Sequence, residues 1–254
     1  MIDWGFYGVF RSQNLDSAGY HQQWFDNGGY GQESYSGAQL MPREAWAVVP
    51  DLWFRYMQRF DYFSGIRVEL EAAAVIGSVG AASDDATTAT KSRDIQQFAA
   101  ALEVEYDYKE LTFGVHTGIA TGDSAAGFGL KPGDEVLYEA GLNDDGDKIA
   151  NESITAFKFD RNYHVDLLMF REMIGTVTNA FYIKPFVAYD LFDSVEDALG
   201  ARLDIIYGHL LEPEAAPGNT SGCAVDGTCA SSLGLEFDLS LFYEEKGRFN
   251  FDIQ

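Results

Sequence analysis

"IRVELEAAAVIG", residues 66–77, alternates between two kinds of side chain. An alternation with a period of two predicts a β-strand whose two faces differ in chemistry. The nature of the solvent at each face depends on the rest of the chain. One parity carries Ile66, Val68, Leu70, Ala72, Ala74 and Ile76, and the other carries Arg67, Glu69 and Glu71.

The same alternation recurs through most of the 254 residues. The aromatic content of 15% and the 26 glycines, against 6 prolines, also favour a β-rich chain with many turns. We therefore expect an all-β protein. The further alternating segments are VPDLWFRYM (49–57), FAAALEVEYDY (98–108), 111–119, FYIKPFVAYDL (181–191), LGARLDIIYG (199–208), LGLEFDLSLFY (233–243) and RFNFDIQ (248–254).

The connections between these segments alternate strictly between short and long, so all short turns lie at one end of the sheet. This asymmetry is typical of an antiparallel up-and-down transmembrane β-barrel with short periplasmic turns and long extracellular loops. The short connections are 58–64, 107–110, 192–197 and 244–247. The long ones are 11–43, 80–93, about 121–178, and 209–230.

One segment, YHVDLLMFREMIG (163–175), is apolar enough to be another strand. A further crossing here would move the 209–230 loop and its cysteines to the side of the short turns. We therefore expect 121–178 to be one long extracellular excursion that folds inward or over the mouth of the pore. The weak helical spacing of Val165, Leu168, Met169 and Glu172 leaves a short helix and an irregular packed loop both open.

Aromatic residues flank every short turn, as an interfacial girdle at headgroup depth would require. A soluble antiparallel sheet with one wet face, in a sandwich or a lipocalin-like barrel, produces the same alternation in any single strand. Turn asymmetry, strand length and aromatic placement together favour the membrane barrel. The aromatic residues are Tyr56, Phe60, Tyr62, Phe63, Tyr106, Tyr108, Tyr189, Phe192, Tyr243 and Phe249.

We expect residues 1–254 to form a single outer-membrane barrel domain. The alternation gives about nine crossings, whereas single-chain bacterial barrels usually have an even number, so we expect strands to be lacking at one or both ends. No run of about 18 apolar residues occurs that would form a membrane helix. No secretion signal precedes the first strand, so we expect it to be removed or to lie outside these residues.

The charge of the chain is strongly negative, with 17 Lys plus Arg against 40 Asp plus Glu and a net charge of −23. Such a field repels phosphate polymers, so we expect no nucleic-acid partner. The expected partners are outer-membrane lipid and, as open alternatives, other envelope proteins or further copies of the barrel.

The charged residues of the strands share the parity that faces away from lipid, because each would cost several kcal/mol in hydrocarbon. Two interpretations stay open: a water-filled pore whose acidic excess attracts cations, and a lumen closed by ion pairs. The candidate lumen-lining residues are Asp51, Arg55, Arg67, Glu69, Glu71, Glu103, Glu105, His116, Lys184, Asp190, Arg202, Asp204, Glu236 and Asp238.

The two cysteines, Cys223 and Cys229, lie in the polar segment CAVDGTC and suit a disulfide in a loop of an oxidising compartment. Two free thiols remain an alternative, and metal binding is disfavoured because no His lies nearby. A calcium site is a weaker hypothesis for NDDGDK (143–148), where Asp144, Asp145 and Asp147 surround a glycine. A closing Glu is missing, and a solvated loop tip is the other interpretation. We expect no other cofactor.

No set of residues predicts an enzyme. His116 and His164 are not tied by any motif to a serine, as a lipolytic site would require. Glu69 and Glu71 have the pairing of a glycosidase, but similar carboxylates recur on other strands, which favours a charged wall.

Residues 159–192, FDRNYHVDLLMFREMIGTVTNAFYIKPFVAYDLF, followed by 199–208, resemble Gram-negative outer-membrane barrels of the alginate-export type and a related group of uncharacterised barrels from predatory and gliding bacteria. A second patch of resemblance spans VPDLWFRYM and residues 67–77. The resemblance implies a β-barrel in the bacterial outer membrane. Alginate exporters are expected to line the pore with Arg and Lys, whereas the inward parity here is at least as rich in carboxylates.

We therefore expect a porin-like channel for passive or gated diffusion of small cationic or neutral solutes. The alternative is a structural barrel with a plugged lumen that anchors a multiprotein complex across the envelope.

Overall fold

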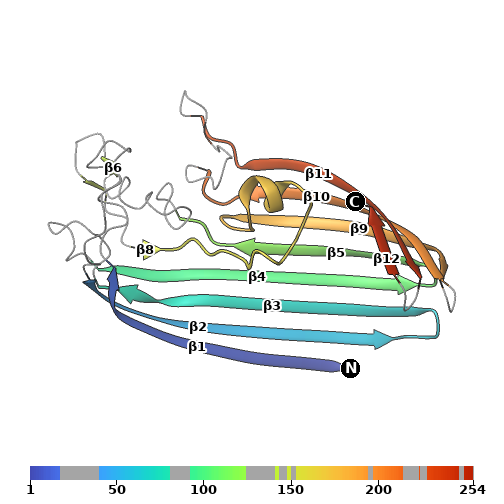
Figure 1. The fold of residues 1–254 in the computed structure, drawn as a ribbon, viewed down its shortest axis with the longest axis horizontal. Coiled ribbons are helices and arrows are strands. Elements are labelled where there is room, and N and C mark those ends of the chain that lie inside the picture. Colours follow the sequence, from blue (N-terminus) through green and yellow to red (C-terminus); the bar gives the residue numbers. More distant parts are fainter. Residues whose placement is uncertain are drawn as a thin grey trace.

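The computed structural model confirms an all-β chain. It describes residues 1–17, 40–80, 92–123, 141–142, 148–149, 153–193, 197–213, 223, 228–245 and 249–253. Nine antiparallel strands follow one another across the main sheet in the order β1-β2-β3-β4-β5-β9-β10-β11-β12 (Figure 1). They are β1 (Ile2–Ser17), β2 (Leu40–Arg59), β3 (Ser64–Val79), β4 (Arg93–Tyr108), β5 (Leu111–Ala120), β9 (Ala180–Asp193), β10 (Asp197–Leu210), β11 (Ser232–Glu245) and β12 (Phe249–Ile253).

The sheet has two edges within the described residues and does not close on itself. Strand β1 pairs with β2, and β12 pairs with β11. Short strand β8 (Ser153–Ile154) adds a parallel pairing to the start of β4, while β6 (Gly141–Leu142) and β7 (Lys148–Ile149) pair only with each other. The structure thus establishes an antiparallel meander of consecutive strands.

The alternation of short and long connections is confirmed. Residues 60–63, 109–110, 194–196 and 246–248 separate the strands of the four hairpins, and longer stretches separate the other neighbours. The predicted 11–43 loop was too long, because β1 extends to Ser17 and β2 begins at Leu40. Backbone pairing continues there past a register shift between Gln13 and Leu15, although the mostly polar sequence hides the strand.

One face of the main sheet is apolar and exposed. On β11, Leu235, Phe237 and Leu239 are 62%, 64% and 61% exposed. The described residues of the chain leave this face uncovered. One row of paired residues that crosses this face consists of Ile66, Tyr106, Phe113, Val187, Leu203 and Leu239.

The opposite face of the same sheet is polar. Direct cross-strand pairing aligns one residue from each of five neighbouring strands, β2, β3, β4, β5 and β9. Because side chains alternate between faces, this register places the charged residues of all five strands on the same face of the sheet. The row consists of Arg55, Glu69, Glu103, His116 and Lys184.

A segment from the long 121–178 connection lies against the polar face; we call residues 163–174 the covering segment. It contains the π-helix η1 (Met169–Ile174), so the helical alternative is confirmed. Phe170 is 1% exposed, and its ring lies 5.9 Å from the ring of Tyr182 on β9. Apolar packing therefore fixes this segment to the sheet. The buried core residues are Ala99, Ala120, Val165, Met169, Phe170, Val177, Ala180, Tyr182 and Ile206.

The predicted disulfide between Cys223 and Cys229 is present. It closes part of the connection between β10 and β11, at the same end of the sheet as the other long connections. The predicted calcium ligands Asp144, Asp145 and Asp147 lie outside the described residues.

Candidate functional site

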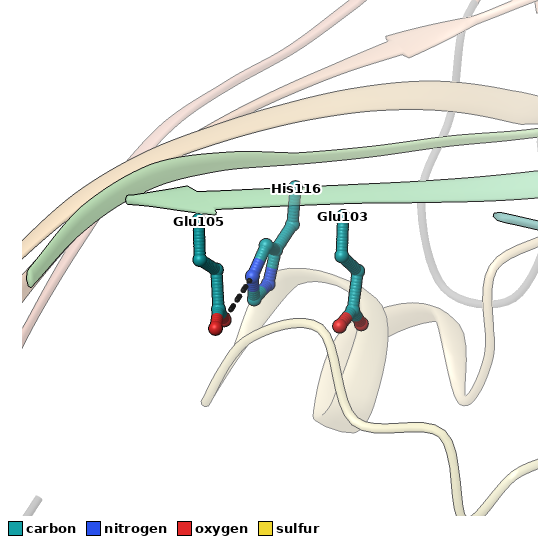
Figure 2. Close-up of side chains that lie close together, drawn as sticks. All are labelled: Glu103, Glu105 and His116. Atoms are coloured by element: carbon teal, nitrogen blue, oxygen red, sulfur yellow. Dashed lines mark hydrogen bonds and ion pairs between the residues drawn. The ribbon is translucent and has the colours of Figure 1, made fainter. Parts of the chain in front are cut away.

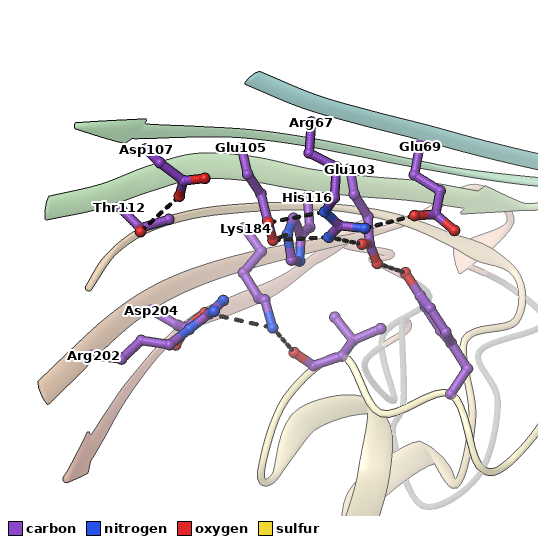
Figure 3. Close-up of polar contacts among 12 residues, drawn as sticks. Arg67, Glu69, Glu103, Glu105, Asp107, Thr112, His116, Lys184, Arg202 and Asp204 are labelled. Atoms are coloured by element: carbon purple, nitrogen blue, oxygen red, sulfur yellow. Dashed lines mark hydrogen bonds and ion pairs between the residues drawn. The ribbon is translucent and has the colours of Figure 1, made fainter. Parts of the chain in front are cut away.

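The polar face carries an ion-pair cluster centred on Arg67 of β3. Its guanidinium lies 2.6 Å from Glu69, 2.8 Å from Glu103 and 2.9 Å from Glu105 (Figure 3). Glu69 is two residues along the same strand, and both other carboxylates come from β4. Strand alternation and antiparallel register bring the four side chains together, since Arg67 pairs directly with Glu105 and Glu69 with Glu103.

His116 of β5 joins this cluster. Its Nε2 lies 3.0 Å from Glu105 Oε1, and its ring packs edge-on against Phe186, with centroids 5.0 Å apart. Figure 2 shows Glu103, Glu105 and His116 extending from the sheet toward the side where the covering segment lies. We define the Arg67 cluster as Arg67, Glu69, Glu103, Glu105 and His116.

Glu103, Glu105 and His116 also offer three ligand atoms within 4.8 Å of one another, which is close enough to hold a metal ion. The guanidinium of Arg67 contacts oxygens of both carboxylates. A metal at this position would have to displace that cation or lie beside it, at a cost in charge repulsion. The arrangement therefore fits an ion-pair network better than a metal centre.

A second cluster lies on β9 and β10. Arg202 donates from Nε and Nη2 to the two carboxylate oxygens of Asp204, both at 2.8 Å, and its guanidinium lies 3.8 Å from the ring centroid of Phe186. Lys184 Nζ lies 3.5 Å from the same carboxylate. Two cations thus share one buried carboxylate, and Phe186, in contact with both His116 and Arg202, links this cluster to the first.

Two carboxylates bind backbone amides at the start of the covering segment, one from the sheet and one from the segment itself. Glu236 of β11 accepts hydrogen bonds from the backbone N–H groups of Leu167, Leu168 and Met169 at 3.2, 2.8 and 2.8 Å. Asp166 accepts two more from Phe170 and the residue after it. Burial raises the pKa of Asp166 above its usual value, and these two hydrogen bonds oppose that shift.

Tyr163 connects the covering segment to the Arg67 cluster. Its hydroxyl donates to Glu103 Oε1 at 3.3 Å and lies 3.0 Å from the hydroxyl of Tyr182. Because the single proton of Tyr163 points to the carboxylate, Tyr182 is the donor in the second bond. Burial raises the pKa of Tyr163 to about 12, so this hydroxyl stays neutral and can donate.

Two hollows border the polar face. One, of about 490 Å³, lies between the sheet and the covering segment and is lined by Glu103, His116 and Asp204, among others. The other, of about 1060 Å³, lies toward the short turns and is lined by Arg67 and Glu105, among others. No residue of the described part of the chain lines both.

The structure distributes the predicted polar residues over several groups. Arg55 pairs with Asp3 of β1 at 3.0 Å, apart from the Arg67 cluster. Asp51 and Glu71 line a separate hollow of about 250 Å³ beside Trp53. Asp190 borders the larger hollow and Asp238 the smaller one.

Sequence reasoning did not include Trp53, Tyr163, Asp166 and Tyr182 among the site residues. Trp53 donates from Nε1 to Glu69 at 2.7 Å. Trp53 shares its position in the strand alternation with Asp51 and Arg55, and this pattern already indicates that its side chain lies on the polar face. The residues of the covering segment had no such signal, because a helical loop carries no strand parity.

Comparison of the chain with protein-family models, with curated proteins and with solved structures found no match in any of the three. The resemblance to alginate-export-type barrels therefore stays a prediction from the sequence. Within the described residues, no helix is both long and apolar enough to span a membrane.

Proposed function

We propose that this chain forms the wall of a transmembrane β-barrel in the bacterial outer membrane and acts as a channel for small cationic or neutral solutes. The observation that best supports this proposal is the difference between the two faces of the sheet. One face exposes rows of Leu, Phe, Ile and Val, and the other holds the ion pairs. Contiguous apolar surfaces of this extent are rare on soluble monomers. A lipid environment would stabilise such a face.

Strand length and aromatic placement support the same proposal. A tilted transmembrane strand needs about 9 to 11 residues, and the strands β2 to β5 and β9 to β11 have at least 10. Phe60, Tyr62 and Phe63 at the first short turn are all exposed. Exposed rings near the short turns suit the headgroup region at the periplasmic side.

The acidic excess of the polar face supports a preference for cations. Nine carboxylates and four basic side chains make up the charged residues predicted on this parity, together with His116. A pore wall with such an excess raises the local concentration of cations and repels anions. The covering segment lies against this wall, and we infer that it narrows the pore. We infer no catalytic activity for the site.

Membrane fractionation followed by bilayer recording tests the proposal. We expect the protein to require detergent for extraction and to conduct ions with cation over anion preference after reconstitution. Recovery in the aqueous fraction without detergent would contradict the membrane location.

The second candidate is a structural barrel with a plugged lumen that anchors an envelope complex. It is favoured by the firm attachment of the covering segment, in which Phe170 is buried and Glu236 binds three backbone amides. It predicts no conductance from intact barrels and copurification of partner proteins in mild detergent. Further copies of the chain and other envelope proteins are the partners to seek.

A further inference from the structure

The Arg67 cluster lies at the boundary between the two hollows. Along β4, Glu105 borders the larger hollow near the short turns, and Glu103, two residues away on the same face, borders the smaller one. Arg67 contacts both carboxylates, at 2.9 and 2.8 Å. A solute that moves along β4 from one hollow to the other therefore passes the guanidinium and its carboxylates.

The covering segment approaches the same point from the other side. Tyr163 donates its hydroxyl proton to Glu103 and accepts one from Tyr182. The boundary is thus formed by the sheet on one side and by a tyrosine of the covering segment on the other. It is one of the places where the wall and the segment meet through polar groups.

The charges of the Arg67 cluster do not balance. Three carboxylates surround one guanidinium, which leaves two negative charges when His116 is neutral. The side chains of Arg67, Glu103 and Glu105 are 28%, 23% and 21% exposed, so the cluster reaches the water of the hollows. A net negative site of this kind attracts small cations, and the fixed guanidinium weakens that attraction.

We propose that the Arg67 cluster is the charge-selective constriction of the channel and that Arg67 is the residue that sets the strength of its preference for small cations over anions. This inference rests on the proposed channel function. The carboxylates supply the attraction, and Arg67 limits it by neutralising one of the three.

Bilayer recording with potassium chloride gradients tests the inference on the full chain. The Arg67→Gln variant removes one positive charge, and we expect the potassium-to-chloride permeability ratio to rise about 25-fold, because one unit charge at about 4 Å in water favours potassium and disfavours chloride by about fivefold each. The Glu103→Gln variant removes a negative charge, and the ratio should fall by a similar factor. If Arg67→Gln does not fold, Glu103→Gln still tests the inference with the opposite sign.

The Arg161→Gln variant is the matched control, because Arg161 is exposed and borders neither hollow. Its permeability ratio should stay within twofold of the wild type. A conducting wild type whose ratio responds equally to Arg67→Gln and Arg161→Gln, or to neither, overturns the inference and leaves the channel function standing. A folded wild type without any conductance instead overturns the proposed function.

Discussion

Lys184 on β9 donates a hydrogen bond from Nζ to the backbone carbonyl oxygen of Val165 at 2.7 Å. A charged side chain of the sheet thereby holds the main chain of the covering segment. The same ammonium lies 3.5 Å from Asp204, which Arg202 also binds. Loss of Lys184 would therefore remove one of the hydrogen bonds that hold the segment, while Asp204 keeps a cationic partner.

We predict that Lys184→Met loosens the covering segment. A hydrogen bond from a charged group contributes about 1.5–3 kcal/mol, so amide hydrogen exchange around Val165 should accelerate about tenfold or more. Hydrogen–deuterium exchange mass spectrometry in detergent measures this rate. The control is Lys109→Met at the short turn between β4 and β5. Equal exchange in Lys184→Met and the wild type would show that the bond does not hold the segment.

We predict that Glu236→Gln exposes η1 to protease. The wild-type carboxylate accepts bonds from three consecutive amides, whereas a neutral amide side chain has one oxygen to accept them and no charge. Trypsin should then cleave after Arg171 several times faster than in the wild type. Glu110→Gln, at an exposed position in the turn between β4 and β5, should leave the cleavage rate unchanged. Identical rates in all three proteins would refute this role of Glu236.

The raised pKa of Asp166 predicts a pH dependence of stability. Folding favours its protonated form, chiefly because burial disfavours the charge and secondarily because Glu236 repels it. The free-energy cost of burying the ionised Asp166 carboxylate is absent below the ordinary carboxyl pKa of about 3.9. It grows as the pH rises from there to the raised pKa and is constant above it.

The comparison with Asp166→Asn isolates this contribution. The free energy of unfolding of the wild type, relative to that of the variant, should fall as the pH rises through that interval. Denaturant titrations in detergent at several pH values between 3 and 7 measure the difference. A difference that is independent of pH, or that grows with pH, would contradict the burial of a costly charge at this position.

We predict that Gly118→Ala destabilises the contact between sheet and covering segment. A Cβ at Gly118 would lie 2.6 Å from Cε1 of the Tyr182 ring, which itself packs on Phe170. Overpacking of this kind costs about 1–3 kcal/mol, measurable as a lower unfolding midpoint. Gly5→Ala is the matched control, because its Cβ would meet Trp53 at an ordinary 3.8 Å. Equal midpoints for both variants would mean that the ring moves aside freely.

The sequence predicted the sheet well because strand parity and turn position are local signals. Polar and apolar residues alternate clearly in the segments around Glu69, Glu103 and Lys184. Pairing of neighbouring strands in chain order then aligns their polar residues in rows across the sheet. It failed at residues 12–17, where polar side chains on both faces hide the period of two.

The individual contacts of the site could not be predicted in the same way. The alternation of the strand places Arg67 on the polar face but does not predict which three carboxylates it pairs with. Those partners depend on the register of the strands and on the side-chain rotamers. Tyr163 reaches Glu103 across 60 residues of chain. Such long-range contacts depend on how the covering segment folds back, and no periodicity in the sequence encodes that path.

Strands β5 and β9 pair continuously from Leu111 with Tyr189 to Ala120 with Ala180, although the whole 121–179 stretch intervenes between them. The pairing of β5 with β9 is therefore continuous across that insertion, which adds the short parallel strand β8 to β4. Substitutions within the insertion leave the backbone hydrogen bonds between β5 and β9 in place. Evolution, or an engineer, can thus vary what obstructs the polar face independently of the scaffold that carries it.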